Sequence, residues 1–174
     1  MRKNRIIILM FVFIASIVNG QSIDTQKSKI SFEIGNMKLN TVEGTFLGMS
    51  GKIIFNPSDI STAHFEVCVE AASVNTGNEK RDDHLRKEDF FDVEQFPTIC
   101  IRANSIVENG EGFLLTGELT MHGVTKNIEI PFTFISNTFR GALEVSRFDY
   151  SIGEDTSKFM VSENVEISII CILK

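Results

Sequence analysis

The chain has 174 residues, of which 43% are hydrophobic and 23% charged, and a formal net charge of −6 at pH 7. Such an acidic chain is repelled by nucleic acid and by anionic membrane surfaces, so we expect no nucleic-acid partner. The length suits one domain with a sizeable core.

The first twenty residues have the pattern of a signal peptide. Three basic residues among the first five precede an apolar run at residues 6–18, and Val18-Asn19-Gly20 ends in the small residue that signal peptidase accepts. The apolar run is shorter than the roughly 20 residues that span a bilayer. We predict cleavage after Gly20, export to the periplasm or the cell exterior, and a mature domain of residues 21–174 without stable membrane insertion. An uncleaved membrane anchor is the alternative.

From Ile30 onward, apolar residues recur at every second position, as in β-strands with one buried face. Ile30 and Phe32 share one face, for example, while Ser31 lies on the other. Residues 41–55 form one long strand, or two, because three glycines interrupt them and glycines inside a strand mark bends. The alternating runs are 30–34, 41–55, 65–71, 98–104, 113–121, 128–134, 141–147 and 165–173.

These runs predict about eight strands joined mostly by short turns, such as the tight turn at His122-Gly123. Short connections make neighbouring strands antiparallel. One apolar face over successive hairpins indicates an up-and-down barrel or a sandwich, and the glycine-bent strands favour the barrel. The predicted fold class is therefore all-β, an eight-stranded antiparallel barrel.

Residues 73–97, which we name the lid segment, break the alternation. Thr76-Gly-Asn-Glu79 has the form of a capping box with Thr76 as the N-cap. The following helix is short and holds one large apolar side chain, Leu85, so only packing can stabilise it. Phe90 and Phe91 then direct the segment onto an apolar surface. We predict a short helical lid between two strands.

Three polar residues of the lid segment, Arg81, Asp82 and His84, are predicted to form a hydrogen-bonding network that anchors it. Mixed-sign residues on a short helix more often solvate or fix it than contact a ligand, but direct ligand contact is the alternative. The neighbouring basic residues Lys80, Arg86 and Lys87 carry charge that attracts an anionic head group.

The interior of an eight-stranded barrel is either filled by side chains or holds one small ligand. Thirteen phenylalanines follow residue 20, and they suit either a packed core or an apolar tunnel, because they have no group that needs a hydrogen bond. Gly117, in the middle of an apolar face, predicts free space beside it. Strands of about 10 residues make a barrel about 30 Å long, enough for an extended chain-like ligand.

At this point the chain resembles the YceI-like family. The resemblance covers essentially the whole mature chain and rests on several ordered motifs. They are Ser73-Val-Asn-Thr-Gly77, Arg81-Asp-Asp-His-Leu85, Asp89-Phe-Phe-Asp-Val93, Phe96-Pro97, Gly117-Glu-Leu-Thr-Met-His-Gly-Val-Thr-Lys126 and Arg147-Phe-Asp-Tyr-Ser-Ile-Gly153. The resemblance implies a lipocalin-like eight-stranded barrel, secreted or periplasmic in bacteria. It also implies a bound polyisoprenoid, such as a prenylated quinone or a prenyl pyrophosphate.

The chain departs from the family pattern at three positions. Lys27 and Asn36 stand where many members have histidine, and Ser151 stands where glycine is usual. These positions bear on the head group more than on the tail. The predicted tunnel therefore consists of apolar-parity and lid residues. They are Phe32, Phe65, Val67, Leu85, Phe90, Phe91, Ile101, Leu115, Leu119, Ile130, Phe132 and Ile167.

We predict a binding protein without a cofactor or metal, not an enzyme. A metal-dependent hydrolase would need His64, His84 and His122 to converge, with Asp82 or Asp83 beside them, but their wide spacing argues against a zinc site. No nucleophile motif of the Gly-x-Ser-x-Gly type is present. A structural or interaction barrel with a filled core is the other alternative.

Three cysteines leave at least one unpaired in an exported chain. Cys68 and Cys100 share the polar parity on strands that flank the lid segment, so a disulfide between them is one hypothesis and three free thiols the other. Cys171 has the apolar parity and is predicted to be a buried small hydrophobe. A homodimer is also expected, from the resemblance and from apolar residues with outward parity. These residues are Leu114, Ile170 and Ile172.

Overall fold

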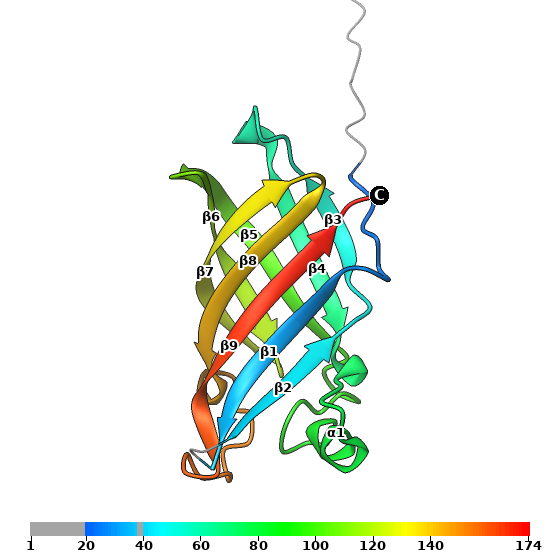
Figure 1. Cartoon of the computed structure of the whole chain (residues 1–174), viewed down its shortest axis with the longest axis vertical. Coiled ribbons are helices and arrows are strands. Elements are labelled where there is room, and N and C mark those ends of the chain that lie inside the picture. Colours follow the sequence, from blue (N-terminus) through cyan, green and yellow to red (C-terminus); the bar gives the residue numbers. More distant parts are fainter. Residues whose placement is uncertain (1–19, 38–39) are drawn as a thin grey trace, which may run out of the picture.

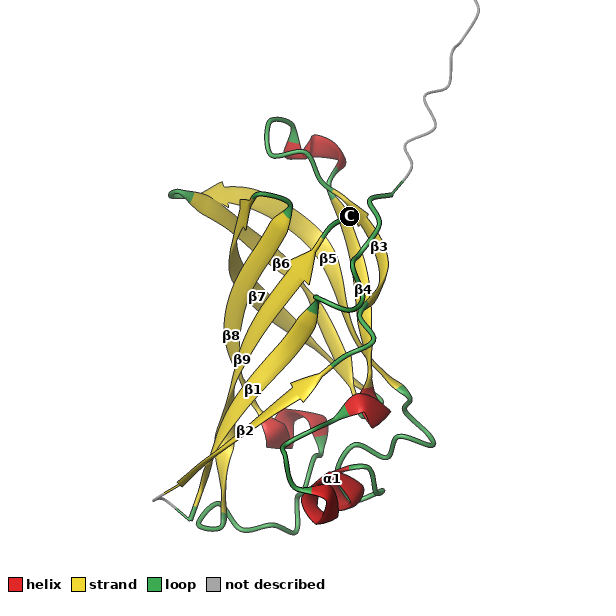
Figure 2. Ribbon diagram, turned by 45° about the vertical axis from the view of Figure 1, so that its right-hand side comes forward, coloured by secondary structure: helices red, strands yellow, loops and turns green. Residues whose placement is uncertain are grey.

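The computed structural model describes residues 20–37 and 40–174, so the predicted signal peptide lies outside the described residues. The described chain forms nine β-strands, one α-helix and three short 3-10 helices (Figures 1 and 2). The strands are β1 (Lys29–Asn36), β2 (Asn40–Phe46), β3 (Ser50–Ile54), β4 (His64–Glu70), β5 (Thr98–Asn109), β6 (Gly112–Met121), β7 (Val124–Ile135), β8 (Thr138–Ser146) and β9 (Val161–Ile172). The helices are η1 (Ile60–Thr62), η2 (Ala71–Ser73), α1 (Glu79–Leu85) and η3 (Arg147–Tyr150).

All strand pairs are antiparallel, in a single sheet of order β2-β1-β9-β8-β7-β6-β5-β4-β3. The two edge strands, β2 and β3, are consecutive in the chain and are joined by residues 47–49. The sheet therefore curls into a barrel-like wall whose two edges are linked by the chain itself (Figure 1). The all-β, barrel-like prediction is confirmed.

The strand count differs from the predicted eight because residues 41–55 form two strands. The break falls at Gly48, whose φ of +71° lies in the left-handed region that a non-glycine residue avoids. The backbone there leaves the ladder, and Leu47 accepts a hydrogen bond across the bend from the amide of Glu70 at 3.1 Å.

The two ends of the barrel differ. One end carries α1, η2, η3 and the loop of residues 151–160, whereas the other carries η1 and the β5–β6 and β7–β8 turns (Figure 2). We call them the lid end and the turn end. The predicted turn at His122-Gly123 is present as a two-residue connection with positive φ at both residues, as a tight hairpin turn requires.

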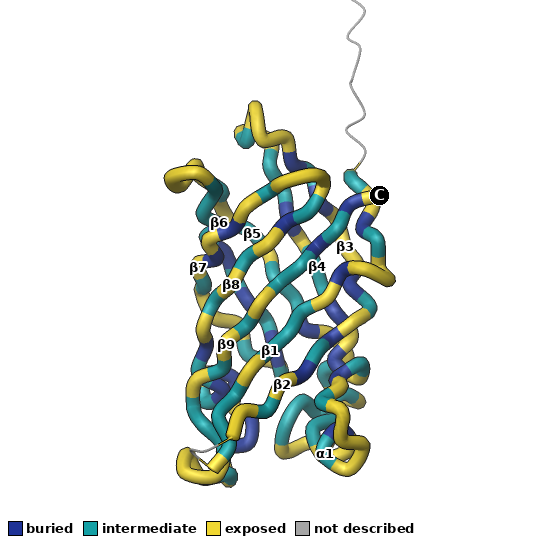
Figure 3. Tube along the Cα trace, in the orientation of Figure 1, coloured by how far each residue is buried: buried dark blue, intermediate teal, exposed yellow. Residues whose placement is uncertain are grey.

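Burial alternates along most strands, so that inward residues form the core and outward residues face solvent (Figure 3). The apolar residues that suggested a homodimer are only half-buried, and dimerisation stays a prediction. In the part of the chain that the structure describes, no helix has the length and hydropathy to cross a membrane.

Gly117 corrects one expectation. A Cβ on this residue would lie 2.2 Å from the carbonyl oxygen of Arg102 on the paired strand, where β5 shifts register between Ala103 and Ser105. The missing side chain thus lets two backbones approach closely at a bulge. The sequence had suggested that Gly117 leaves free space in the interior, and that prediction is wrong.

Candidate functional site

The turn end of the interior is filled with aromatic rings. Six phenylalanines meet there, and we call them the phenylalanine plug. They are Phe55, Phe65, Phe113, Phe132, Phe134 and Phe139. The ring centroid of Phe55 lies between 5.0 and 5.8 Å from each of the other five, and all five contacts are edge-to-face. The sequence allowed either a packed core or an open tunnel, and the structure has an interior that is filled only at the turn end.

The lid half of the interior holds a cavity of about 670 Å³ with mostly apolar walls. This volume falls within the range of small-molecule binding pockets. Its lining includes Asp155 and Ser157, which are exposed at the lid end, so the cavity opens there. A second, smaller cavity of about 70 Å³ has a lining that includes both residues of the larger cavity and residues of the phenylalanine plug.

The predicted tunnel residues divide between the two cavities. Those that line the larger one are Phe32, Leu85, Phe90, Phe91, Ile101, Leu119 and Ile167. Those that line the smaller one are Phe65, Val67, Leu115, Ile130 and Phe132, together with Ile101, which borders both. The predicted strand residues and lid residues therefore line the interior, but strand parity did not separate its open half from its filled half.

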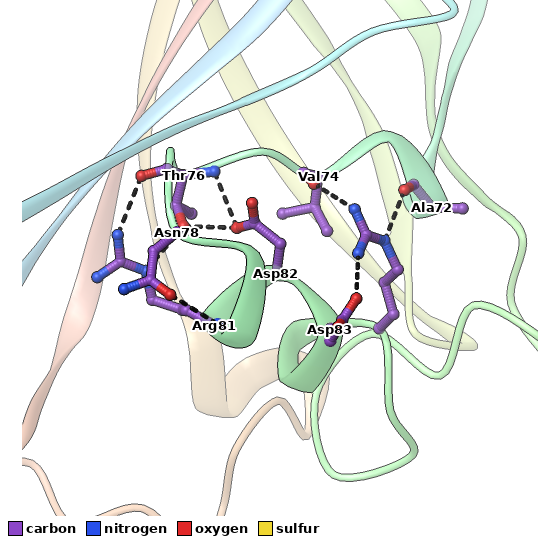
Figure 4. A network of polar contacts seen from close by, with 8 residues as sticks. Ala72, Val74, Thr76, Asn78, Arg81, Asp82 and Asp83 are labelled. Carbon is purple, nitrogen blue, oxygen red and sulfur yellow. Dashed lines mark hydrogen bonds and ion pairs between the residues drawn. The ribbon is translucent and has the colours of Figure 1, made fainter.

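Two predicted network residues, Arg81 and Asp82, fix the lid segment through Thr76 (Figure 4). Asp82 is buried, and its Oδ1 accepts hydrogen bonds from the Thr76 amide at 2.9 Å and from the Thr76 hydroxyl. Arg81 donates from Nε to the Thr76 hydroxyl at 2.8 Å and from a terminal nitrogen to the Thr76 carbonyl at 3.0 Å. A carboxylate and a guanidinium therefore hold one threonine from both sides.

The predicted capping box is wrong by two residues. The N-cap of α1 is Asn78, whose side chain accepts from the Arg81 amide, whereas Thr76 lies outside the helix. The Thr76 hydroxyl instead donates to the Asp82 carboxylate and accepts from the Arg81 guanidinium.

The third network residue, His84, is placed differently. Its Nε2 lies 2.7 Å from a carboxylate oxygen of Asp89, and its ring packs edge-to-face on Phe90. Phe91 packs edge-to-face on Phe46 of β2, with ring centroids 5.2 Å apart. His84 is thus joined to the second half of the lid segment, and Phe91 attaches that half to the barrel wall.

A residue outside the predicted network, Arg86, also anchors α1. It donates to the carbonyl oxygens of Ala72 and Val74, both at 2.9 Å, and pairs with Asp83 at 3.0 Å. Figure 4 labels these three partners. These carbonyls belong to the segment that leaves β4. Arg86 was expected as a head-group attractant, but its guanidinium is used to hold the lid segment.

Arg147 organises the opposite side of the cavity mouth. It is 2% exposed, lines the cavity, and donates to five carbonyl oxygens. The acceptors belong to Ile152, Gly153, Thr156, Val161 and Ser162. Burial lowers the pKa of its guanidinium, and the charge of Glu163 partly offsets that shift.

The five carbonyl oxygens that accept hydrogen bonds from Arg147 belong to the loop of residues 151–160 and the start of β9. One cation thus shapes the loop that borders the cavity. The sequence did not predict this role, although Arg147 is the first residue of the last motif of the resemblance, Arg147–Gly153.

A disulfide joins the two strands that precede and follow the lid segment. Cys68 on β4 and Cys100 on β5 are direct cross-strand partners and are bonded to each other, with Cα atoms 4.1 Å apart. The disulfide hypothesis is therefore confirmed. Cys171 is a free, buried thiol, as predicted.

The three histidines do not converge in the structure. His64 lies beside Glu66, His84 beside Asp89, and His122 beside the carbonyl oxygen of Tyr150. Within residues 20–37 and 40–174, no group of three or more histidine, cysteine, aspartate or glutamate side chains is placed to hold a metal ion.

Several lining residues were not predicted, mainly those of β8, β9 and the loop between them. This group includes Leu143, Val145, Arg147, Ile152, Met160, Val161 and Val165, and further unpredicted lining residues lie on β1, β2, β4, β5 and β6. The parity of Leu143, Val145 and Val165 would have placed them inside the barrel. The loop residues follow no period, so nothing in the sequence predicted their position.

The fold and the site define a class of protein: a curled antiparallel wall around an apolar chamber, with a helical segment at the open end. A comparison with family profiles matches residues 21–171 to the YceI-like domain. The chain therefore belongs to the YceI-like family.

Among curated relatives, a UPF0312 protein of Ectopseudomonas mendocina is 30% identical over 153 residues, which cover 82% of this chain and 79% of that protein. A UPF0312 protein of Vibrio parahaemolyticus is 32% identical over 116 residues, which cover 65% of this chain and 61% of the relative.

Solved structures agree on the fold. BcnA of Burkholderia cenocepacia superposes with a TM-score of 0.81 at 24% identity, over 88% of this chain and 100% of that one. A YCEI protein of Campylobacter jejuni has a TM-score of 0.71 at 25% identity, over 78% of this chain and 86% of its own. A polyisoprenoid binding domain from Saccharophagus degradans has a TM-score of 0.70 at 19% identity, over 89% of this chain and 98% of its own.

Proposed function

We propose that the mature domain, residues 21–174, binds a polyisoprenoid or a similar long-chain lipid in the 670 Å³ cavity and catalyses no reaction. The apolar lining of that cavity is the observation that carries the proposal. Transfer of apolar ligand surface out of water contributes roughly 25 cal/mol per Å² before the costs of association. A prenyl tail thus gains affinity without any polar contact along its length.

The family and the related fold of the Saccharophagus degradans polyisoprenoid binding domain support this ligand class. The proposal includes export through the signal peptide and a role in transport, storage or stress protection of the lipid. A head group of the quinone or pyrophosphate type would lie at the lid end. The polar lining residues Arg81 and His84 are found there.

Organic extraction and mass spectrometry of the protein exported by its native host test the proposal. A series of ions spaced by isoprene units would support it and identify the head group. Reproducible absence of any lipid from freshly exported protein would contradict it.

A charge placed inside the cavity gives a second test. Leu119 is 3% exposed and lines the cavity, so Leu119→Arg puts an unpaired cation among apolar walls. We expect lipid to be lost from the extracted protein. Thr116→Arg, on an outward-facing position of the same strand, is the matched control, and circular dichroism of both variants separates lost binding from lost folding.

A further inference from the structure

The cavity has one open end and one closed end. Polar and exposed lining residues lie at the lid end, whereas the phenylalanine plug fills the turn end. Phe55 is 4% exposed, and Phe65, Phe132 and Phe139 are buried to a similar degree. A tail that enters from the lid end therefore meets a packed aromatic wall before it can reach the turn end.

A neck of aliphatic side chains comes before that wall. Ile30, Val69, Ile99 and Ile101 line both the larger and the smaller cavity, so they form the boundary between them. Val69 and Ile99 are cross-strand partners on β4 and β5, which ties two of these side chains to the most buried part of the wall. The space behind the neck is only about 70 Å³.

The volume in front of the neck sets a capacity. If each heavy atom of the tail takes roughly 30 Å³, the volume of one water molecule in the liquid, about 670 Å³ corresponds to about 22 heavy atoms. Each isoprene unit has five carbon atoms, so this capacity corresponds to about four units.

We propose that the neck and the phenylalanine plug act as a chain-length limit, so that the protein encloses about four isoprene units and leaves any further units outside. The inference rests on the proposed function, because it specifies the tail that the same cavity takes. Ile30, Val69, Ile99 and Ile101 are then specificity-determining residues, and the rings behind them keep the neck in place.

A homologous series of ligands tests the limit. Prenyl alcohols from geraniol, with two isoprene units, to octaprenol, with eight, compete against a bound fluorescent apolar probe on the full mature protein. Each unit added inside the cavity should strengthen binding by roughly tenfold or more, because it removes several carbons from water. Beyond about four units the affinity should level off, because the added carbons stay in water.

Opening the neck should move this plateau. Ile101→Ala removes three carbons and joins the 70 Å³ space to the larger cavity, a gain of about 160 Å³ or about five heavy atoms. The plateau should shift from about four to about five units. Ile106→Ala is the matched control, because Ile106 lies on the same strand and packs against the core but lines neither cavity.

Narrowing the cavity should move the plateau the other way. Leu143→Trp adds six heavy atoms at a wall position of the larger cavity, which removes about 180 Å³ or about one isoprene unit. This variant fills space instead of creating it, so it keeps the test decisive if Ile101→Ala fails to fold.

The outcomes separate the two proposals. If no prenyl alcohol of any length displaces the probe, the proposed function is wrong. If the alcohols bind but affinity keeps rising from four to eight units, or the plateau is the same in all folded variants, lipid binding stands and the chain-length limit is wrong.

Discussion

At the scale of single residues, Arg147 is the side chain whose loss should cost most. All five of its N–H groups donate to carbonyl oxygens, and the residue is 2% exposed. Arg147→Met leaves several buried carbonyls without a donor, which should lower the free energy of unfolding by about 3 kcal/mol or more. Urea denaturation measures the change.

Two further variants test whether the lost hydrogen bonds cause the lower stability of Arg147→Met. Arg147→Lys keeps the charge but has three donors instead of five, so it should recover only part of the stability. Arg140→Met changes the same chemistry at an exposed position and should be nearly neutral. If Arg140→Met cost as much as Arg147→Met, the carbonyl contacts would not be the reason.

The buried side chains of Cys171 and Tyr150 should make the stability of the fold depend on pH in the alkaline range. Burial raises the pKa of the Cys171 thiol from its ordinary 9.0 to about 11 and that of the Tyr150 hydroxyl from 10.0 to about 12. At a pH between the ordinary and the raised pKa of either group, the unfolded chain has lost that proton while the folded chain keeps it. The folded state is therefore favoured fully below pH 9, and this contribution disappears as pH rises through 9–11 for Cys171 and 10–12 for Tyr150.

Denaturation at pH 8, 9, 10 and 11 tests this sign. Cys171→Ala should flatten the part of the decline that begins near pH 9, by at most about 2.7 kcal/mol for two pKa units. The folded protein should also react slowly with a thiol reagent at pH 8 and quickly in denaturant. A fast reaction of the folded protein would contradict burial of this thiol.

At the scale of elements, the disulfide joins β4 and β5 at the two ends of the lid segment, with a sequence separation of 32 residues. Closing a loop of that length should stabilise the fold by about 3–4 kcal/mol through the unfolded state. Replacing both Cys68 and Cys100 by serine should lower stability by up to that amount. A thiol count in denaturant without reductant should find one free thiol, and a count of three would contradict the bond.

Strand positions could be predicted because a period of two fixes which side chains face inward. Phe32 and Leu119 were placed on the cavity wall in this way. The same period says nothing about height along the barrel axis, so the rings that meet at Phe55 could not be separated from those that line open space. The phenylalanine plug therefore required the structure.

The lid segment shows a second limit of local patterns. Its helix was predicted, but Thr76 and Asn78 are both good capping residues two positions apart, and only the contact of Thr76 with Asp82 decides between them. The contacts of Arg147 were likewise not predictable. Its acceptors are carbonyls of an irregular loop, which every residue possesses and no sequence pattern marks.

At the scale of the whole molecule, the two halves of the barrel interior differ in packing. The turn half is packed by the phenylalanine plug, while the lid half contains the cavity, whose open end is bordered by α1 and the loop of residues 151–160. At the lid end, hydrogen bonds from a few polar side chains, such as Arg86 and Arg147, hold α1 and the loop, whereas the turn end has dense ring packing. We therefore expect local opening to be easier at the lid end.

Bound lipid should protect the two halves unequally from amide hydrogen exchange. A ligand at 100 times its dissociation constant slows exchange about 100-fold wherever opening requires its release. That effect should appear in α1 and residues 151–160, whereas we expect amides around Phe55 to exchange only by global unfolding and so to change only with global stability. Exchange mass spectrometry of lipid-bound and extracted protein measures the difference, with Leu119→Arg as the variant expected to show none. Protection that is strongest at the turn end would mean that the lipid occupies the other half of the barrel.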